Sequence, residues 1–361
     1  MSRYFLTGAA GFIGSTASER LLKEGHDLVV LDNFNDYYDP ALKEKNVRIV
    51  KAIAKEHGRK YTLIRGDMRD AKLLDKIFAE NTFDGVISWA AMAGVRPSIE
   101  DPRTYVEVNV LGLTNLLEAM RQHDCKKLVF ISSSSVYGNN QKVPFSEQDP
   151  VDRPISPYAA TKKAGEVLCH TYHALFDMDI HCLRYFTVYG PRQRPDLAIN
   201  KFTRLLLEGE KIPMFGDGST SRDYTYVDDI VEGTLLSLHY LEDHQGVYDI
   251  FNLGGSHPIS LKDLIAVIGK EVGVEPVIEQ LPMQPGDVER TYSDFSHAKE
   301  ILGYDPQVRI EEGIHRFVEW YRKEYGPFKG GYDGIIDLLG NTTDSLSVTE
   351  VLAQIEKEKV K

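Results

Sequence analysis

Short apolar runs alternate with longer amphipathic stretches along most of the chain. The apolar runs predict strands at residues 4–6, 28–31, 61–64, 85–89, 128–131, 180–183 and 248–253. Most of the stretches between them predict helices. Strands that alternate with helices are typical of a parallel sheet with helices on both faces. We therefore expect an α/β fold with a doubly wound parallel sheet, in which ligands bind at the carboxyl ends of the strands.

A glycine-rich turn follows the first predicted strand directly. It has the sequence Thr7-Gly8-Ala9-Ala10-Gly11-Phe12-Ile13-Gly14. Glycines at this spacing let the backbone approach a pyrophosphate, and the next helix aims its N-terminal amides at it. A tight turn without a ligand is the alternative. The second predicted strand ends in Asp32, which suits a ribose diol and repels the 2′-phosphate of NADP. The turn and Asp32 predict a Rossmann-type domain that binds NAD, although Lys43, Lys45 and Arg48 leave NADP open.

A tyrosine and a lysine four residues apart begin another predicted helix, which Ser156 can cap. Residues at this spacing share one helix face, so the ammonium of Lys162 can favour the phenolate form of Tyr158. The pKa of a free tyrosine, about 10, is too high for a base at neutral pH without such a neighbour. A solvated helix surface is the alternative. However, residues 132–135 are serines at the end of a predicted strand, and their hydroxyls could complete a catalytic site.

Composition narrows the function classes. The 361 residues carry a formal net charge of -12, which argues against a general nucleic-acid surface, so an anionic ligand must meet local cations. The cysteines Cys125, Cys169 and Cys182 are odd in number and form no C-x-x-C pair. We expect reduced thiols in the cytoplasm and no metal site. No apolar run approaches the length of a membrane span, and no signal peptide is evident, so we expect a soluble protein.

A smaller α/β substrate-binding lobe interleaves with the sheet along the chain. A segment rich in proline, glycine and charge begins at Arg192, where we place the crossing into this lobe. We read the basic helix after residue 40 as a solvated face. The expected domains are an NAD-binding Rossmann domain of residues 1–190 plus about 227–257, and the smaller lobe of about 191–226 plus 258–326, which the family resemblance given below implies to be nucleotide-sugar-binding.

Residues 327–361 form an expected C-terminal extension. A capping box at Ser347 precedes an amphipathic helix, whose apolar stripe consists of Val348, Val351, Leu352 and Ile355. This stripe needs a partner, either the chain's own lobe or a neighbouring subunit.

Together these motifs resemble those of the extended short-chain dehydrogenase/reductase superfamily. Within it, the chain resembles the NDP-sugar epimerases, and most closely the UDP-glucuronate 4-epimerases, over about residues 3–325. The resemblance implies that NAD is used catalytically. Tyr158 would take the proton of the sugar's 4-hydroxyl while hydride leaves C4, and hydride would return to the other face of the resulting ketone.

The resemblance assigns roles position by position. The catalytic residues would be Ser133, Tyr158 and Lys162. The cofactor-binding residues would be Gly8, Gly11, Phe12, Ile13, Gly14, Asp32, Asn33, Asp67, Met68, Ala90, Ala91, Asn109, Tyr158 and Lys162. The substrate-binding residues would be Ser134, Ser135, Thr187, Arg194, Asn200, Arg222 and Arg290. The expected partners are a UDP-sugar and a second copy of the chain in a homodimer, with no nucleic acid and no membrane.

Three positions depart from the family pattern. Trp89 replaces a histidine and Met92 replaces a glutamine, which affects cofactor packing. Gln284 stands where galactose-type epimerases often carry arginine. Dehydratases of this superfamily place an Asp-Glu pair where Ser134 and Ser135 stand, so we expect no elimination reaction here.

The substrate prediction depends on Thr187 and on the sequence Arg194-Pro195-Asp196. Galactose-type epimerases commonly carry asparagine at the position of Thr187, whereas uronate epimerases resemble this chain at Thr187 and in the Arg-Pro-Asp sequence. Hydroxyls and a guanidinium could bind a C6 carboxylate, so we predict that UDP-glucuronate and UDP-galacturonate interconvert. The alternative is that the threonine packs and Arg194 pairs with Asp196. The alternative functions are a UDP-glucose or UDP-N-acetylglucosamine 4-epimerase, a non-catalytic dinucleotide sensor, and an NADP-linked carbonyl reductase, of which the last two are disfavoured.

Overall fold

The computed structural model describes residues 1–283 and 288–326. Gln284 and the predicted stripe of Val348, Val351, Leu352 and Ile355 lie outside the described residues.

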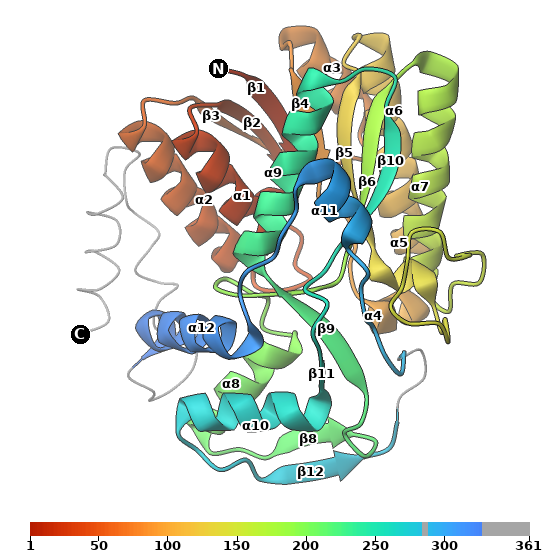
Figure 1. The fold of residues 1–361 in the computed structure, drawn as a ribbon. Coiled ribbons are helices and arrows are strands. Elements are labelled where there is room, and N and C mark those ends of the chain that lie inside the picture. The colour runs from red at the N-terminus through yellow and green to blue at the C-terminus, as the bar shows by residue number, and fades with distance from the viewer. Residues whose placement is uncertain (284–287, 327–361) are drawn as a thin grey trace.

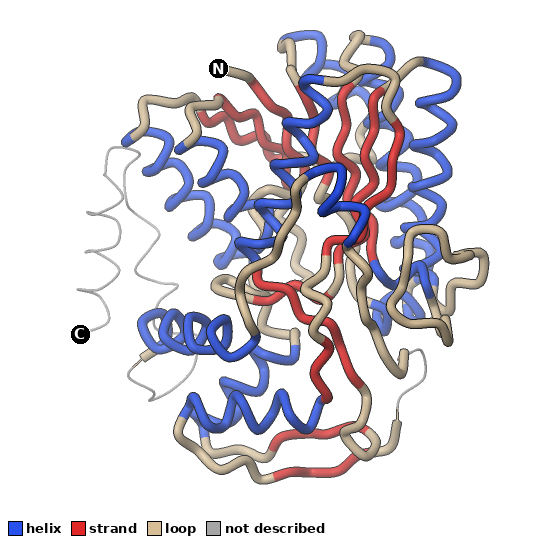
Figure 2. Tube along the Cα trace, in the orientation of Figure 1, coloured by secondary structure: helices blue, strands red, loops and turns tan. Residues whose placement is uncertain are grey.

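Within these residues, the centre of the fold is a seven-stranded sheet with the order β10-β6-β5-β4-β1-β2-β3 (Figures 1 and 2). All neighbouring strands are parallel. The strands are β1 (Arg3–Thr7), β2 (Asp27–Asp32), β3 (Tyr61–Arg65), β4 (Gly85–Ser88), β5 (Lys127–Ser133), β6 (Asp179–Tyr185) and β10 (Tyr248–Leu253). The predicted parallel sheet and its seven strands are confirmed. The order reverses between β1 and β4, and such a switch point is where ligands bind in open α/β sheets.

Helices cover both faces of this sheet (Figure 2). One face packs against α1 (Phe12–Lys23), α2 (Pro40–Glu56) and α9 (Val227–Asp243). The other face packs against α3 (Ala71–Glu80), α6 (Gly112–Gln122) and α7 (Pro157–Phe176). Alternate residues of a strand point to opposite faces, so in β2 Leu28 and Val30 join the first core while Val29 and Leu31 join the second. Because both faces are buried, the strands read as continuous apolar runs.

The prediction of a solvated face for α2 is wrong. Lys43 and Lys45 are buried in it, and α2 packs along α1. The Nζ of Lys43 donates to Asn35 Oδ1 at 2.9 Å, and Lys45 pairs with Glu324. Buried charges persist when they are paired in this way. Lys43 and Lys45 therefore serve tertiary contacts rather than solvation.

A smaller body lies beyond the carboxyl ends of the strands (Figure 1). It contains a three-stranded sheet of β7 (Thr187–Tyr189), β9 (Ser221–Tyr226) and β11 (Pro258–Ser260), and a parallel pair of β8 (Ile212–Phe215) and β12 (Ile278–Leu281). Its helices are α8 (Ala198–Glu208), α10 (Leu261–Val272) and α12 (Ile310–Tyr325), while α11 (Ser296–Leu302) packs on α9 and β10. A single residue, Phe186, separates β6 from β7, so the sheet leads directly into this body.

Short helical segments complete the walls around the sheet's carboxyl ends. They are α4 (Val95–Glu100), α5 (Pro102–Val106), the π-helical η1 (Glu107–Leu111) and the 3₁₀-helical η2 (Ser134–Tyr137). The described part of the chain contains no helix long and apolar enough to span a bilayer. Cys125, Cys169 and Cys182 are buried free thiols.

Candidate active site

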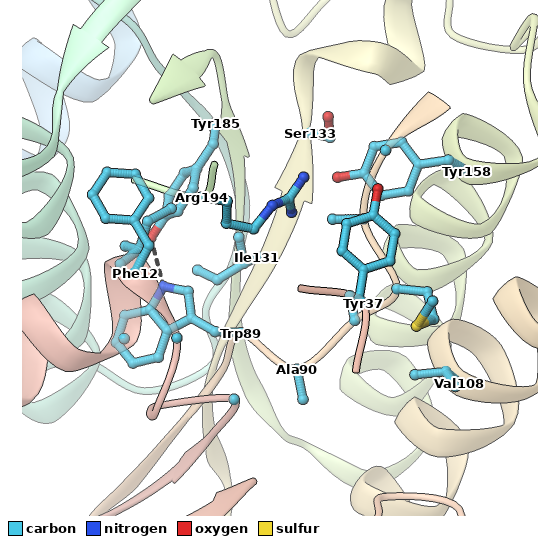
Figure 3. A pocket seen from close by; sticks show the side chains of 18 of the residues that line it. Phe12, Tyr37, Trp89, Ala90, Val108, Ile131, Ser133, Tyr158, Tyr185 and Arg194 are labelled. Atoms are coloured by element: carbon cyan, nitrogen blue, oxygen red, sulfur yellow. Dashed lines mark hydrogen bonds between the residues drawn. The ribbon is translucent and has the colours of Figure 1, made fainter. Parts of the chain in front are cut away.

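A cavity of about 490 Å³ lies at the carboxyl ends of the strands, beside the switch point between β1 and β4 (Figure 3). It brings together most of the residues predicted for catalysis and binding. The predicted residues in its wall are Gly8, Gly11, Phe12, Ile13, Gly14, Asp32, Asn33, Asp67, Met68, Ala90, Ala91, Ser133, Ser134, Ser135, Tyr158, Lys162, Thr187 and Arg194.

The glycine turn forms one end of the cavity from backbone alone. Gly8 has a φ of +72°, and a Cβ at this position would lie 2.7 Å from the Ala90 nitrogen. A Cβ at Gly14 would lie 2.6 Å from the Ala9 Cα. Gly11 is the N-cap of α1 and contributes no side-chain cap. The turn thus encloses a space that any side chain at Gly8 or Gly14 would fill. The N-terminus of α1, the positive end of the helix, lies behind this space. A space of this kind fits the pyrophosphate of a dinucleotide.

Asp32 lies at the carboxyl end of β2, where backbone amides hold its carboxylate. Oδ2 accepts from the Ala10 N–H at 3.1 Å, and Oδ1 accepts from the Phe34 N–H at 2.9 Å. The two oxygens offer about four lone-pair sites, so acceptor capacity remains for ribose hydroxyls. Lys43 Nζ lies 3.7 Å from Oδ1. This lysine offsets part of the negative charge that would repel a 2′-phosphate.

Asp67 follows β3 and is ionised at neutral pH. Burial would raise its pKa, but hydrogen bonds from Arg69 hold the pKa of Asp67 down to about 2. Arg69 Nε and Nη2 donate to the two carboxylate oxygens at 3.0 and 2.9 Å, and Asn33 Nδ2 donates at 3.0 Å. The neighbouring Met68 is buried, and its carbonyl accepts from Asn115 Nδ2. The result is a fixed acceptor beside an apolar side chain, which suits a purine with an exocyclic amine.

Lys162 is buried beneath Tyr158, one helical turn along α7. Its Nζ donates to the Ile131 carbonyl at 2.7 Å and lies 6.0 Å from the centre of the Tyr158 ring. Burial lowers the pKa of Lys162 to about 8, while the charge of Glu166 acts to raise it. The lysine is therefore close to its titration point near neutral pH.

Tyr158 points its hydroxyl toward Ser133 across the cavity (Figure 3). Burial raises the pKa of Tyr158, whereas a hydrogen bond with Ser133 and the charge of Arg194 lower it. The Lys162 ammonium donates to the Ile131 carbonyl, and the effect of its charge on the pKa of Tyr158 stays a prediction. Ser133 and Arg194 are thus two groups that favour the phenolate.

The serine run turns the corner from β5 into η2. Ser133 Oγ caps η2 by accepting from the Ser135 N–H at 3.1 Å, and it donates to Ser135 Oγ at 3.1 Å. Ser132 Oγ donates to Glu166 Oε1 at 2.7 Å, and Arg184 pairs with both oxygens of Glu166 at 2.9 Å. This buried network, which the sequence did not reveal, ties α7 to β5 and β6. It fixes Tyr158 relative to the serines.

The remaining wall of the cavity is aromatic and carries Arg194. The Arg194 guanidinium makes a two-bond pair with Asp196 and lies 5.0 Å from the centre of the Tyr37 ring. The alternative pairing considered from the sequence is thus present, yet Arg194 still lines the cavity. Opposite it, the Trp89 indole N–H donates to the Tyr185 hydroxyl at 3.2 Å (Figure 3). Sequence reasoning missed Tyr37 and Tyr185, although the aromatic loop after Asp32 was a visible signal for the first.

The structure places four predicted residues outside this cavity. Asn109 supports the wall from behind, since its amide bonds to the backbone of Met92 and to Thr161. Asn200 is buried, and its Nδ2 donates to the Gln193 carbonyl at 2.7 Å. The other two residues belong to the smaller body.

Arg222 lines a second cavity of about 250 Å³, together with Arg96 and Lys201. Leu197 lies in the wall of both cavities, so the two are neighbours. Arg290 is exposed and bridges to Ser221, beside Arg222 on β9. The smaller cavity therefore concentrates positive charge in a chain whose net charge is -12.

Comparisons with known proteins agree with this geometry. The sequence model of the GDP-mannose 4,6 dehydratase family matches residues 5–317. The UDP-glucuronate 4-epimerase of Thermodesulfobacterium geofontis is 44% identical, over 90% of this chain and 97% of that protein. The crystal structure of the Bacillus cereus UDP-glucuronic acid 4-epimerase, in complex with UDP-glucuronic acid and NAD, matches with a TM-score of 0.81 and 35% identity, over 89% of this chain and 99% of that chain.

A neutral-sugar enzyme is also similar. The UDP-glucose 4-epimerase of Thermotoga maritima, crystallised with UDP-glucose, matches with a TM-score of 0.79 and 32% identity, over 89% of this chain and 99% of that chain. The fold alone therefore does not distinguish the two sugar classes.

Proposed function

Because the chain belongs to the GDP-mannose 4,6 dehydratase family, we propose that it is an isomerase that inverts C4 of a UDP-sugar with the help of NAD. The observation that carries this proposal is the cavity at the switch point, where Ser133, Tyr158 and Lys162 lie beside an intact dinucleotide cradle. A sensor without catalysis has no need for such a base. The T. geofontis and B. cereus relatives support the same reaction class.

NAD would be held at its pyrophosphate by the turn of Gly8, Gly11 and Gly14, at its adenosine ribose by Asp32, and at its adenine by Asp67. Bound there, NAD supplies an acceptor for hydride from the sugar. Glycine at positions 8 and 14 leaves room for the pyrophosphate of NAD, because a Cβ at either position would fill the cradle. A deep cleft of this kind favours a cofactor that is kept through turnover.

The chain's own residues handle the proton. Tyr158 accepts the proton of the sugar's 4-hydroxyl and later returns it, and Ser133 hydrogen-bonds to the same oxygen atoms. Lys162 supplies positive charge beneath the ring while its Nζ stays anchored to Ile131. Burial keeps water from quenching the ketone intermediate. Since proton and hydride both return, the reaction has no net redox change.

Ser134 and Ser135 direct the intermediate toward epimerisation. Elimination needs an acid for the leaving hydroxyl and a base for the C5 proton, and serine does neither readily at neutral pH. Thus the chain does not run the dehydratase reaction after which its family is named.

A uronate is the sugar that the cavity suits best. Arg194 places a guanidinium at the sugar end, and Thr187, Ser134 and Ser135 offer hydroxyls that donate without becoming acids. A carboxylate fixed by these donors is hindered from aligning for loss of carbon dioxide. Arg222, with Arg96 and Lys201, would bind the UDP diphosphate in the neighbouring cavity. We therefore propose UDP-glucuronate and UDP-galacturonate as the interconverting pair.

The test is to incubate the purified protein separately with UDP-glucuronate, UDP-glucose and UDP-N-acetylglucosamine, and to identify products by NMR. We expect UDP-galacturonate as the main product and the highest kcat/KM for UDP-glucuronate. Thr187→Val and Arg194→Ala should lose uronate activity or release UDP-pentose. An equal or higher kcat/KM on UDP-glucose would contradict the uronate assignment, and a 4-keto-6-deoxy sugar as main product would contradict epimerisation.

A homodimer completes the proposal. Val106 and Leu111 are exposed on α5 and η1, and Val167 and Leu175 are exposed on α7, which packs beside them. Adjacent helices with exposed apolar side chains are suited to pair with a second copy. Light scattering should give twice the chain mass, and Leu175→Glu should shift the measured mass toward that of the monomer.

Three free thiols are consistent with a cytoplasmic location.

A further inference from the structure

Two neighbours hold the guanidinium of Arg194: Asp196 pairs with its edge, and the ring of Tyr37 lies against its face. Its Nε and Nη2 donate to Asp196 Oδ1 and Oδ2 at 2.9 and 2.8 Å. Its guanidinium carbon lies 5.0 Å from the centre of the Tyr37 ring. A two-bond pair fixes both the position and the plane of a guanidinium, and an aromatic face adds cation–π attraction. These contacts leave the head group of Arg194 with little freedom.

Tyr37 is itself held in place by Gly94 and Tyr105. Gly94 has a φ of +103°, and a Cβ there would lie 2.8 Å from the Tyr37 hydroxyl. That hydroxyl interacts with the hydroxyl of Tyr105, which donates to the Ala93 carbonyl at 2.7 Å. The Tyr105 ring meets the Tyr158 ring edge to face, with centres 6.2 Å apart. Tyr105 therefore lies between Tyr37, which supports Arg194, and the proposed base Tyr158.

Asp196 occupies a position that is unfavourable for binding an anion. It lines the second cavity with Arg96, Lys201 and Arg222, and its side chain is 43% exposed. A carboxylate there repels a diphosphate unless a cation offsets its charge. Arg194 is that cation. The pair thus stands between the cavity for the sugar and the cavity for the nucleotide.

We infer that Asp196 and Tyr37 are positioning residues that hold Arg194 so that its remaining N–H groups face the sugar's carboxylate while its charge stays beside Tyr158. Arginine has five N–H donors, and Asp196 engages two of them. In Figure 3 the guanidinium points into the cavity between the Trp89 wall and the Tyr37 wall. The inference rests on the proposed function, because it requires a uronate in the cavity.

The same arrangement gives Arg194 a second effect. Burial raises the pKa of Tyr158, and the charge of Arg194 acts against this rise. One guanidinium therefore serves both recognition of a carboxylate and activation of the base.

Asp196→Asn tests the effect on recognition. Calorimetry measures the affinities of the variant for UDP-galacturonate and for UDP, which lacks the sugar. The Kd for UDP-galacturonate should rise about tenfold, the size of one lost charge-assisted hydrogen bond. UDP should bind no more weakly than before. Glu208→Gln is the matched control, since it breaks an Arg–carboxylate pair with Arg204 on α8, outside both cavities.

Tyr37→Leu and Tyr37→Phe test the effect on the base. Both variants lack the hydroxyl, so their difference isolates the aromatic ring beneath Arg194. The acidic limb of the kcat profile should lie at higher pH in Tyr37→Leu than in Tyr37→Phe, because a displaced guanidinium no longer lowers the pKa of Tyr158. Retained NAD absorbance verifies that each variant is folded.

The outcomes separate this inference from the proposed function. If the unmodified protein fails to epimerise UDP-glucuronate, the proposed function fails. If it succeeds, an unchanged Kd for UDP-galacturonate in Asp196→Asn overturns the inference alone. Equal weakening of UDP and UDP-galacturonate overturns it too, since that pattern means general damage. Identical pH profiles for the two Tyr37 variants would rule out the link to the base.

Discussion

The two ends of the large cavity are built from different materials. At the dinucleotide end, the cradle for the pyrophosphate is the backbone of the turn from Gly8 to Gly14, and the carboxylate of Asp32 lies beside it. At the sugar end, the walls are side chains from separate segments, among them Ser133, Tyr158 and Arg194. A backbone cradle accepts one kind of ligand and tolerates few changes. A wall of side chains can be retuned one residue at a time, so it is where relatives of one fold differ in substrate.

The largest expected effect lies at the sugar end. Tyr158→Phe removes the group that accepts the proton but keeps the ring, so kcat should fall by about 10³-fold or more, while bound NAD is retained. Tyr172→Phe is the control, because it removes a hydroxyl from the same helix that donates to Glu118 outside the cavity. Near-normal turnover in Tyr158→Phe would eliminate this residue as the base.

The dinucleotide end should respond to the addition of a single methyl group. Gly8→Ala combines a φ of +72° with a contact of 2.7 Å to Ala90, so the protein should lose NAD and about 3 kcal/mol of unfolding free energy. Gly209 has the same φ but nothing within 4 Å of a Cβ. Gly209→Ala should cost only the strain, about 1–2 kcal/mol, and should keep NAD. NAD content by absorbance and urea unfolding distinguish the two variants.

The carboxylate at the same end should decide between the cofactors. Asp32→Ala should weaken NAD binding about tenfold and narrow the preference over NADP, since it removes both a ribose acceptor and a negative charge. In the variant, the positive charge of Lys43, whose Nζ lies 3.7 Å from Asp32 Oδ1 in the unmodified protein, keeps the remaining preference for NAD over NADP small. Asp27→Asn, at the other end of β2, is the control. NADP bound in the protein as isolated would refute the assignment of Asp32.

The smallest effect concerns stability near the base. Burial lowers the pKa of Lys162 to about 8, below the value of about 10.4 in an unfolded chain. Between these values the unfolded chain binds more protons, so the free energy of unfolding should rise with pH from 8 to 10. Lys162→Met should lack this part of the rise. Urea unfolding at several pH values measures it, and parallel curves for the two proteins would contradict the buried charge.

The contrast between the two ends also explains what the sequence could predict. The strands, the glycine turn and Asp32 depend on local backbone rules, and the structure has them where those rules place them. Contacts between distant side chains follow no local rule. The pairs of Trp89 with Tyr185 and of Glu166 with Arg184 join residues that only the fold brings together.

The burial of charged side chains was the other feature that could not be predicted from the sequence. The periodicity of α2 predicted a helix correctly, but its lysines suggested a solvated face, since a lysine in sequence gives no sign of a distant partner. Lys45 finds Glu324 on α12, at the other end of the described chain. Likewise the resemblance assigns Asn109 to the cofactor, whereas its amide is hydrogen-bonded to Met92 and Thr161.

The most direct test of the central claim follows a hydrogen atom. UDP-glucuronate labelled with deuterium at C4 is converted in ordinary water, and the product is examined by NMR. If the cavity removes hydride from C4 and returns it to the opposite face, the UDP-galacturonate formed carries its deuterium at C4, with no hydrogen taken from the solvent. Loss of the label to water, with hydrogen in its place at C4, would contradict the account.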